Sequence, residues 1–165
     1  MSRLPFFYGW IMLPAVMLVT ICTSPGQTYG ISVFNPYIQQ SLGLSSAELS
    51  GAYMIGTVLA SLPLFWVGAL MDRHGPRRVL IGVVVLFGLT CIGMRYVSGL
   101  GSLFLVFFFL RFLGQGSMSM LARNALAMWF ERRLGFASGV SNIGMAVAVG
   151  TVPALGFALV EVYGW

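Results

Sequence analysis

The chain carries very little charge for its length. Charged residues make up 8% of its 165 residues, whereas soluble domains carry about 25%. It contains no lysine, one aspartate and three glutamates. Because the surface of a soluble fold needs more polar groups than this, the composition excludes a soluble enzyme domain, a disordered chain and a secreted disulfide scaffold.

Groups that do chemistry are also scarce. The single histidine, His74, has no second histidine or cysteine nearby in the sequence, and Cys22 and Cys91 form no CxxC or zinc-binding pattern. No HExxH motif, catalytic Ser/His/Asp set or phosphate-binding loop occurs. We therefore expect no enzymatic activity, no cofactor and no metal site. The arginines form no basic patch, so we expect no nucleic-acid partner.

Long apolar runs dominate what is present. Hydrophobic residues make up 58% of the chain, and the mean hydropathy is +0.91. A helix needs about 20 apolar residues to cross a bilayer. The sequence predicts an all-α membrane protein, embedded in lipid, with five transmembrane helices at residues 9–38, 49–71, 79–97, 103–127 and 136–162. The first is longer than a bilayer requires, so it must tilt, protrude or break, and Pro25, Gly26 and Pro36 mark places for a break.

The arginines indicate how the chain is oriented. One side of the predicted bundle collects Arg3, Arg73, Arg77, Arg78, Arg132 and Arg133. The other side has Arg95 alone. Because positively charged loops stay in the cytoplasm, we expect the N-terminus and the loops at residues 72–78 and 128–135 to be cytoplasmic.

Local patterns predict a helix start and two packing faces. Ser45 and Glu48 have the spacing of a capping box that opens the second predicted helix. Small residues recur every four positions in two of the predicted helices, and such stripes let helices touch closely in lipid. The stripes are Ala52, Gly56 and Ala60 in the second helix and Ala146, Gly150 and Ala154 in the fifth.

The loop after the second predicted helix carries a motif. Its fixed positions are Gly68, Asp72, Arg73, Gly75, Arg77 and Arg78. The pattern G-x-x-x-D-R-x-G-x-R-R resembles the cytoplasmic signature of the major facilitator superfamily, in the loop where that family has it. The resemblance implies a conformational latch with a partner in the second half of a transporter. A plain positively charged anchor is the alternative reading.

The fourth predicted helix contains a buried charge. Arg111 lies about 12 Å from the helix start, so it should face the bundle interior or a water-filled cavity rather than lipid. The run Arg111–Gly116 also resembles a motif of the same superfamily. Three roles stay open for Arg111: a counter-ion for an anionic substrate, a part in proton coupling, or a structural hydrogen-bond donor. Arg123 lies nearer the cytoplasmic end, where we expect it to snorkel.

Further segments resemble one branch of the superfamily, the bacterial relatives of monocarboxylate porters and oxalate/formate antiporters. They are residues 7–10, 24–30 and 127–135. The resemblance implies a protein of the bacterial inner membrane and a small organic anion as substrate. Neutral polar residues at mid-membrane depth suit that chemistry, and no acidic residue lies in the centre of a predicted helix. With Arg111, the candidate substrate-binding residues are Gln27, Tyr29, Gln115 and Asn142.

The resemblance also implies how large the complete protein is. Major facilitator transporters have two halves of six helices, and each half contains two inverted three-helix units. The first and fourth predicted helices are then counterparts, each with a Gly-Gln pair, at residues 26–27 and 114–115. We expect this chain to be an incomplete major facilitator bundle that needs the missing C-terminal half and does not transport alone. The alternative is a non-transporting accessory or assembly subunit derived from a transporter half.

Overall fold

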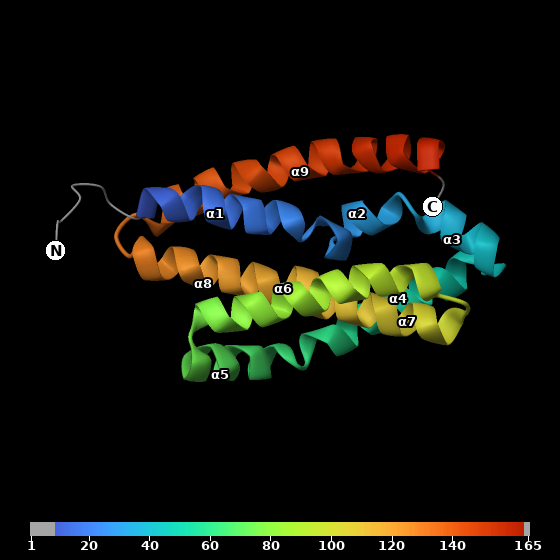
Figure 1. Ribbon diagram of the computed structural model, residues 1–165, viewed down its shortest axis with the longest axis horizontal. Helices are drawn as coiled ribbons and strands as arrows, with labels where there is room; N and C mark the ends of the chain where they lie inside the picture. Colours follow the sequence, from blue (N-terminus) through green and yellow to red (C-terminus); the bar gives the residue numbers. More distant parts are fainter. Residues whose placement is uncertain (1–8, 164–165) are drawn as a thin grey trace.

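The helices of the computed structural model run back and forth along one long axis (Figure 1). The structure describes residues 9–163. The elements are α1 (Gly9–Cys22), η1 (Ser24–Gly26), α2 (Thr28–Ser32), α3 (Asn35–Leu42), α4 (Ser46–Ser61), α5 (Leu64–His74), α6 (Pro76–Gly93), η2 (Met94–Tyr96), α7 (Leu100–Phe109), η3 (Leu110–Met118), α8 (Ser119–Trp129) and α9 (Leu134–Tyr163). The chain is therefore an all-α bundle, as its composition predicts.

Four stretches of helix in the described residues are long and apolar enough to cross a bilayer. They are Ser46–His74, Pro76–Tyr96, Leu100–Trp129 and Leu134–Val162. The predicted span at residues 9–38 is not one continuous helix, because it is divided into the shorter apolar helix α1, η1, α2 and the start of α3. Figure 1 shows α1, α2 and α3 following one another along the bundle. A fifth crossing assembled from these pieces stays a prediction.

The break in the first segment lies at the predicted proline and glycine. Pro25 has no backbone N–H, so it cannot continue the hydrogen-bond ladder of α1. The hydroxyl of Thr23 donates to the Thr20 carbonyl at 2.7 Å, and Ser24 donates to the Ile21 carbonyl, so the end of α1 is satisfied locally. Gln27 is then extended (φ −91°, ψ 155°) before α2 begins.

The predicted capping box at the start of α4 is confirmed. The backbone N–H of Glu48 donates to Ser45 Oγ at 3.2 Å, and the Ser45 N–H donates to Glu48 Oε2 at 2.8 Å. Pro63 interrupts the same stretch further on, where α4 gives way to α5. The second predicted span is thus two helices in succession.

One of the two predicted packing stripes is confirmed, and the other does not pack against the described helices. Ala52, Gly56 and Ala60 are all buried on α4, and a Cβ added at Gly56 would lie 3.4 Å from the Phe108 nitrogen. Ala146, Gly150 and Ala154 of α9 are exposed. The buried small residues of α9 are instead Ala137, Ser141, Gly144 and Ala148. Because α9 is apolar on every side, its pattern did not indicate which face packs inward.

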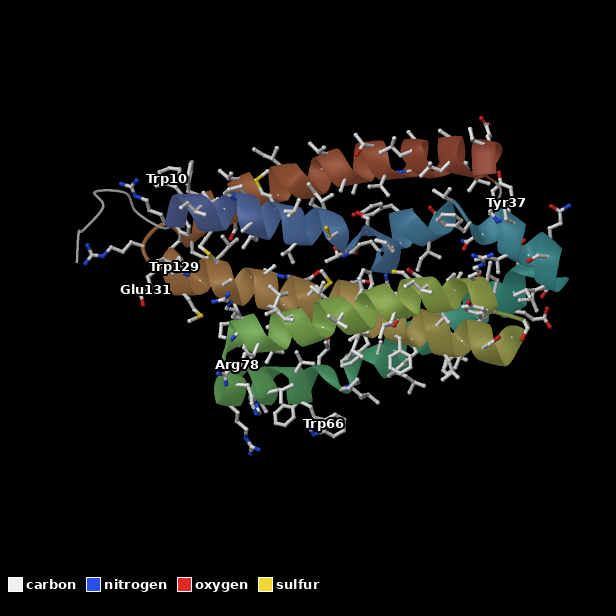
Figure 2. The ribbon with its side chains drawn as sticks, in the orientation of Figure 1. Trp10, Tyr37, Trp66, Arg78, Trp129 and Glu131 are labelled. Carbon is white, nitrogen blue, oxygen red and sulfur yellow. The ribbon has the colours of Figure 1, made fainter. Side chains whose placement is uncertain are left out.

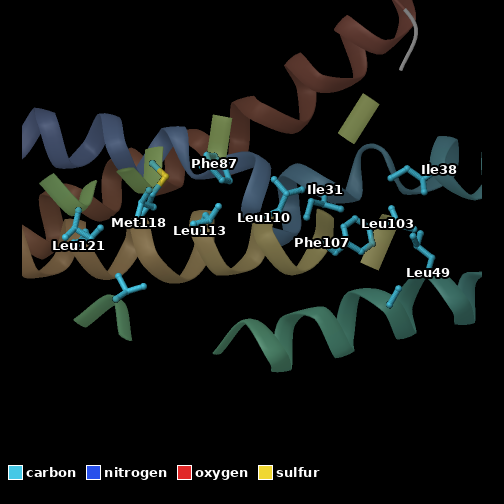
Figure 3. Packing of buried hydrophobic residues seen from close by; sticks show 14 residues of the cluster. Ile31, Ile38, Leu49, Phe87, Leu103, Phe107, Leu110, Leu113, Met118 and Leu121 are labelled. Atoms are coloured by element: carbon cyan, nitrogen blue, oxygen red, sulfur yellow. The ribbon is translucent and has the colours of Figure 1, made fainter. Parts of the chain in front are cut away.

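The stretch Leu100–Trp129 is the central element of the bundle. In its most apolar window 44% of the residues are buried, against 17% in each of the other three spans. Figure 3 shows its side chains facing those of neighbouring helices along the core. Its buried residues include Leu103, Phe107, Leu110, Leu113, Met118 and Leu121. Most of the other helices therefore pack against this stretch.

The middle of that central element is π-helical. The nine residues of η3 form the wider helix, and the Ser117 hydroxyl donates to the Phe112 carbonyl five residues earlier at 2.8 Å. Such segments are rare and frequently occur at functional sites. The sequence analysis did not anticipate it.

Two glycines allow η1 and η3 to cross in close contact. A Cβ added at Gly26 would lie 2.5 Å from the Leu110 carbonyl oxygen and 2.9 Å from the Cα of Gly114. A Cβ added at Gly114 would lie 3.0 Å from the Cα of Gly26 and 2.6 Å from the Phe87 ring. Both glycines belong to the Gly-Gln pairs predicted as counterparts, and they touch at the break of the first segment.

The arginine-rich turns gather at one end of the bundle. The turn between α5 and α6 and the turn between α8 and α9 both lie at the end where α1 begins (Figure 1). Figure 2 places Trp10, Arg78, Trp129 and Glu131 at that end and Tyr37 toward the other. Arg3 and the first residues of the segment 7–10 lie outside the described residues. The assignment of this end to the cytoplasm stays a prediction.

The glycine crossing predicts a large effect for a single methyl group. The variant Gly26→Ala should destabilise the protein by about 1–3 kcal/mol, because the added carbon meets backbone atoms that cannot move aside. The measurement is thermal unfolding of the complete gene product in detergent. The control is Gly88→Ala on α6, where an added Cβ meets nothing within 4 Å. If both variants unfold at the wild-type temperature, the close crossing is wrong.

Candidate functional site

A buried arginine lies at the glycine crossing. Arg111, on η3, is 7% exposed. Its Nε donates to Thr57 Oγ1 at 3.0 Å, and its Nη1 donates to the Gly26 carbonyl at 3.2 Å and to Thr28 Oγ1 at 3.4 Å. The guanidinium carbon lies 4.8 Å from the centroid of the Tyr53 ring, which is a cation–π distance.

Three separate segments supply these partners, and each has a physical reason to be there. The Gly26 carbonyl is available because the chain leaves regular helical geometry at η1. Tyr53 and Thr57 lie one turn apart on the same face of α4. The Tyr53 and Thr28 hydroxyls are 2.9 Å apart and hydrogen-bonded, which joins α4 to the start of α2. The arginine therefore holds the broken segment, α4 and η3 together.

The charge of Arg111 is met only by neutral groups. Within residues 9–163 no carboxylate forms an ion pair with it, and its three hydrogen bonds go to hydroxyls and a carbonyl. Its Nη2 makes no hydrogen bond to the described residues. Placing an arginine at the centre of a membrane helix costs about 2.5–3.5 kcal/mol on insertion scales. A guanidinium held this way keeps donors and a positive charge for an anion.

Arg111 lines a cavity of about 520 Å³ between α4 and the central element. The polar side chains around this cavity are Thr57, Ser61, Arg111, Gln115, Arg123 and Asn124. A second cavity of about 320 Å³ lies between α1, the central element and α9. Gln115 and Arg123 line both cavities. The Oε1 of Gln115 is buried and has no hydrogen-bond partner among the described residues.

The five predicted substrate-binding residues divide between the two cavities. Arg111 and Gln115 share the first, and Gln27, Gln115 and Asn142 share the second. Gln27 donates from Nε2 to Thr23 Oγ1 at 3.2 Å. Tyr29 lines neither cavity, and its hydroxyl contacts Ser24 Oγ at 3.0 Å and Met145 Sδ at 3.8 Å. A substrate-binding role for these residues stays a prediction.

Sequence reasoning missed part of this site. Tyr53, Thr57 and Ser61 recur every four residues in an otherwise apolar stretch, and that polar stripe was the available signal. Arg123 was expected only to snorkel. It is exposed, donates from Nε to the Ser119 carbonyl at 3.3 Å and lines both cavities, so it adds a second positive charge there.

The predicted latch residues lie at the arginine-rich end. Gly75 has a left-handed φ of 79° and turns the chain into α6, where Pro76 is the first residue. A Cβ added at Gly68 would lie 3.2 Å from Met120 Cε, so α5 approaches α8 there. The charged members, Asp72, Arg73, Arg77 and Arg78, are exposed, and no ion pair joins them to one another in the described part of the chain.

The chain is similar in sequence to known proteins. The family model of the Major Facilitator Superfamily matches residues 16–165. The "Oxalate:formate antiporter" of Oxalobacter formigenes is 28% identical over 142 residues, which cover 85% of this chain and 33% of that protein. "Monocarboxylate transporter 3" of Rattus norvegicus is 27% identical over 164 residues, covering 96% of this chain and 32% of that protein.

A third relative is the "Probable L-galactonate transporter" of Escherichia coli K12. It is 29% identical over 143 residues, which cover 82% of this chain and 30% of that protein. This chain thus spans about a third of the length of these relatives. No solved structure matches it.

The hydrogen bond to Thr57 gives a test of the arginine's setting. The variant Thr57→Val keeps the shape of the side chain but leaves Arg111 Nε without a partner, at a cost of about 1.5–3 kcal/mol. The melting temperature of the complete gene product should fall accordingly. The matched variant Thr151→Val removes a hydroxyl that bonds only the Val147 carbonyl of its own helix, so it should change little. Equal melting temperatures for the two variants would contradict the described contact.

Proposed function

Because the chain belongs to the major facilitator superfamily, we propose that it forms the N-terminal part of a secondary transporter that moves a small organic anion across a bacterial inner membrane. The observation that carries the proposal is Arg111, a buried guanidinium beside a cavity with only neutral partners. A carboxylate entering that cavity would supply the missing negative charge. We expect no enzymatic activity.

The cavity has the chemistry that a carboxylate requires. Two guanidinium groups, from Arg111 and Arg123, line it, and none of its lining residues is acidic. A positively charged cleft with low-dielectric walls raises the local concentration of anions and repels cations. Planar guanidinium groups also match the two oxygens of a carboxylate in geometry. The names of the relatives, which specify oxalate, formate, monocarboxylates and galactonate, support the same class.

Gln115 is the best-placed neutral group for orienting a substrate. It lies four residues after Arg111 on η3 and lines the same cavity. Its amide can donate to a carboxylate oxygen beside the guanidinium, or its free Oε1 can accept from a protonated group on the substrate. Because Gln115 also lines the second cavity, we infer that it lies on the path between the two cavities.

Transport itself needs parts beyond these helices. In alternating access one half of the transporter rocks against the other around a central site. We propose that Gly68, Asp72, Arg73, Gly75, Arg77 and Arg78 latch this half to the other on the cytoplasmic side. The four charged residues are exposed in the described helices, which leaves them accessible to such a partner. The N-terminus is cytoplasmic in this proposal, and residues 1–165 alone do not transport.

The counter-ion role of Arg111 has a direct test. The complete gene product is expressed, and uptake of radiolabelled lactate, formate and oxalate into vesicles is measured. Losing one partner of a buried charged pair costs about 2–5 kcal/mol, so Arg111→Gln should lower uptake by about 30-fold or more. The control is Arg95→Gln, which removes an exposed charge at the end of the bundle opposite the arginine-rich turns. Normal uptake by Arg111→Gln at normal membrane abundance would overturn the proposal.

A further inference from the structure

A groove outside the proposed substrate site is charged at one end and apolar along the rest of its length. It has a volume of about 370 Å³ and lies between α5 and α6, with residues of η3 behind it. Val67, Val83 and Leu113 are buried at its base. Leu70 and Leu86 are 47% and 54% exposed at its rim. The groove is therefore apolar inside and open at the surface of the described bundle.

The positive charge of Arg78 lies at one end of this groove, beside the imidazole of His74. His74 is the last residue of α5, and Arg78 is the third residue of α6, so both lie at the arginine-rich end. Figure 2 shows Arg78 at that end of the bundle. No acidic residue lines the groove. Leu86 lies eight residues beyond Arg78, so the apolar part extends about 12 Å along the helix from the charge.

A glycine leaves room inside the groove. Gly82 lies one turn after Arg78 on the same face of α6. A Cβ added there would meet no atom within 4 Å. The groove is thus open next to its apolar walls, one helical turn from its cationic end.

We propose that this groove binds an anionic phospholipid. The phosphate lies on Arg78 and His74, and the upper part of one acyl chain lies over Gly82 between Leu70 and Leu86. The lipid is favoured over a protein segment because the groove has the polarity of an amphiphile, cationic at the membrane surface and apolar toward the membrane centre. Basic pockets of this kind, on the cytoplasmic side of membrane proteins, bind lipid headgroups. The inference assigns Arg78 to the lipid and leaves the proposed latch to the other five residues of the motif, and it does not depend on which solute is transported.

The test compares two lipids that differ in headgroup charge. The complete gene product is purified in mild detergent and titrated with dioleoyl phosphatidylglycerol or dioleoyl phosphatidylcholine, and bound lipid is counted by native mass spectrometry. We expect one retained phosphatidylglycerol, held at least about five-fold more tightly than phosphatidylcholine, as a single arginine near a membrane surface allows. Added inorganic phosphate should not displace it, because the acyl chain contributes to binding. Equal binding of the two lipids would overturn the proposal.

Two substitutions separate the headgroup from the chain. Arg78→Gln should remove the preference for phosphatidylglycerol, whereas Arg95→Gln at the opposite end should keep it. Gly82→Leu should fill the groove and abolish retention of both lipids, whereas Gly88→Leu, at another open position of α6, should not. If Gly82→Leu does not fold, Arg78→Gln decides the question. An unchanged preference for phosphatidylglycerol in Arg78→Gln would overturn the headgroup contact and with it the proposal. If the wild type retains no lipid and Arg78→Gln lowers its thermal stability, protein covers the groove and the proposal is wrong.

Discussion

The contact between Gly26 and Gly114 is the constraint on which the rest of the structure depends. Because neither residue has a side chain, the break in the first segment lies directly against η3. That approach brings the Gly26 carbonyl within 3.2 Å of Arg111 Nη1. A larger residue at either position would separate the segments, and the arginine would lose a buried acceptor. The site is therefore a product of helix packing as much as of its polar residues.

Much of this could be predicted from the sequence, because the relevant physics is local. Pro25 cannot donate a hydrogen bond, so the place of the break in the first segment follows from its own residue. The capping box between Ser45 and Glu48 acts over three residues, and the φ of Gly75 depends on its own turn. The burial of Arg111 follows from the cost of exposing a charge to lipid.

The features that could not be predicted depend on contacts between residues far apart in the sequence. Thr57 is 54 positions from Arg111, and nothing in its own helix indicates which arginine it meets. The π-helical geometry of η3 has no sequence signal of its own in the surrounding apolar run. Ala146 and Ala148 are equally small and apolar, and only Ala148 is buried among the described residues, so the pattern of α9 did not indicate which face packs against this bundle.

In the proposed function, the site at Arg111 selects its ligand by the ligand's negative charge. It is tested most directly by comparing carboxylates with their neutral amides, lactate with lactamide and formate with formamide, as ligands of the purified complete gene product. A ligand that binds the folded state and not the unfolded chain stabilises the protein by RT ln(1 + [L]/Kd), so the melting temperature keeps rising with the logarithm of the ligand concentration above Kd. Lactate or formate should raise the melting temperature progressively with concentration, while the matching amide should leave it unchanged. Equal shifts with acid and amide, or a shift with the amide alone, would contradict an anion site at Arg111.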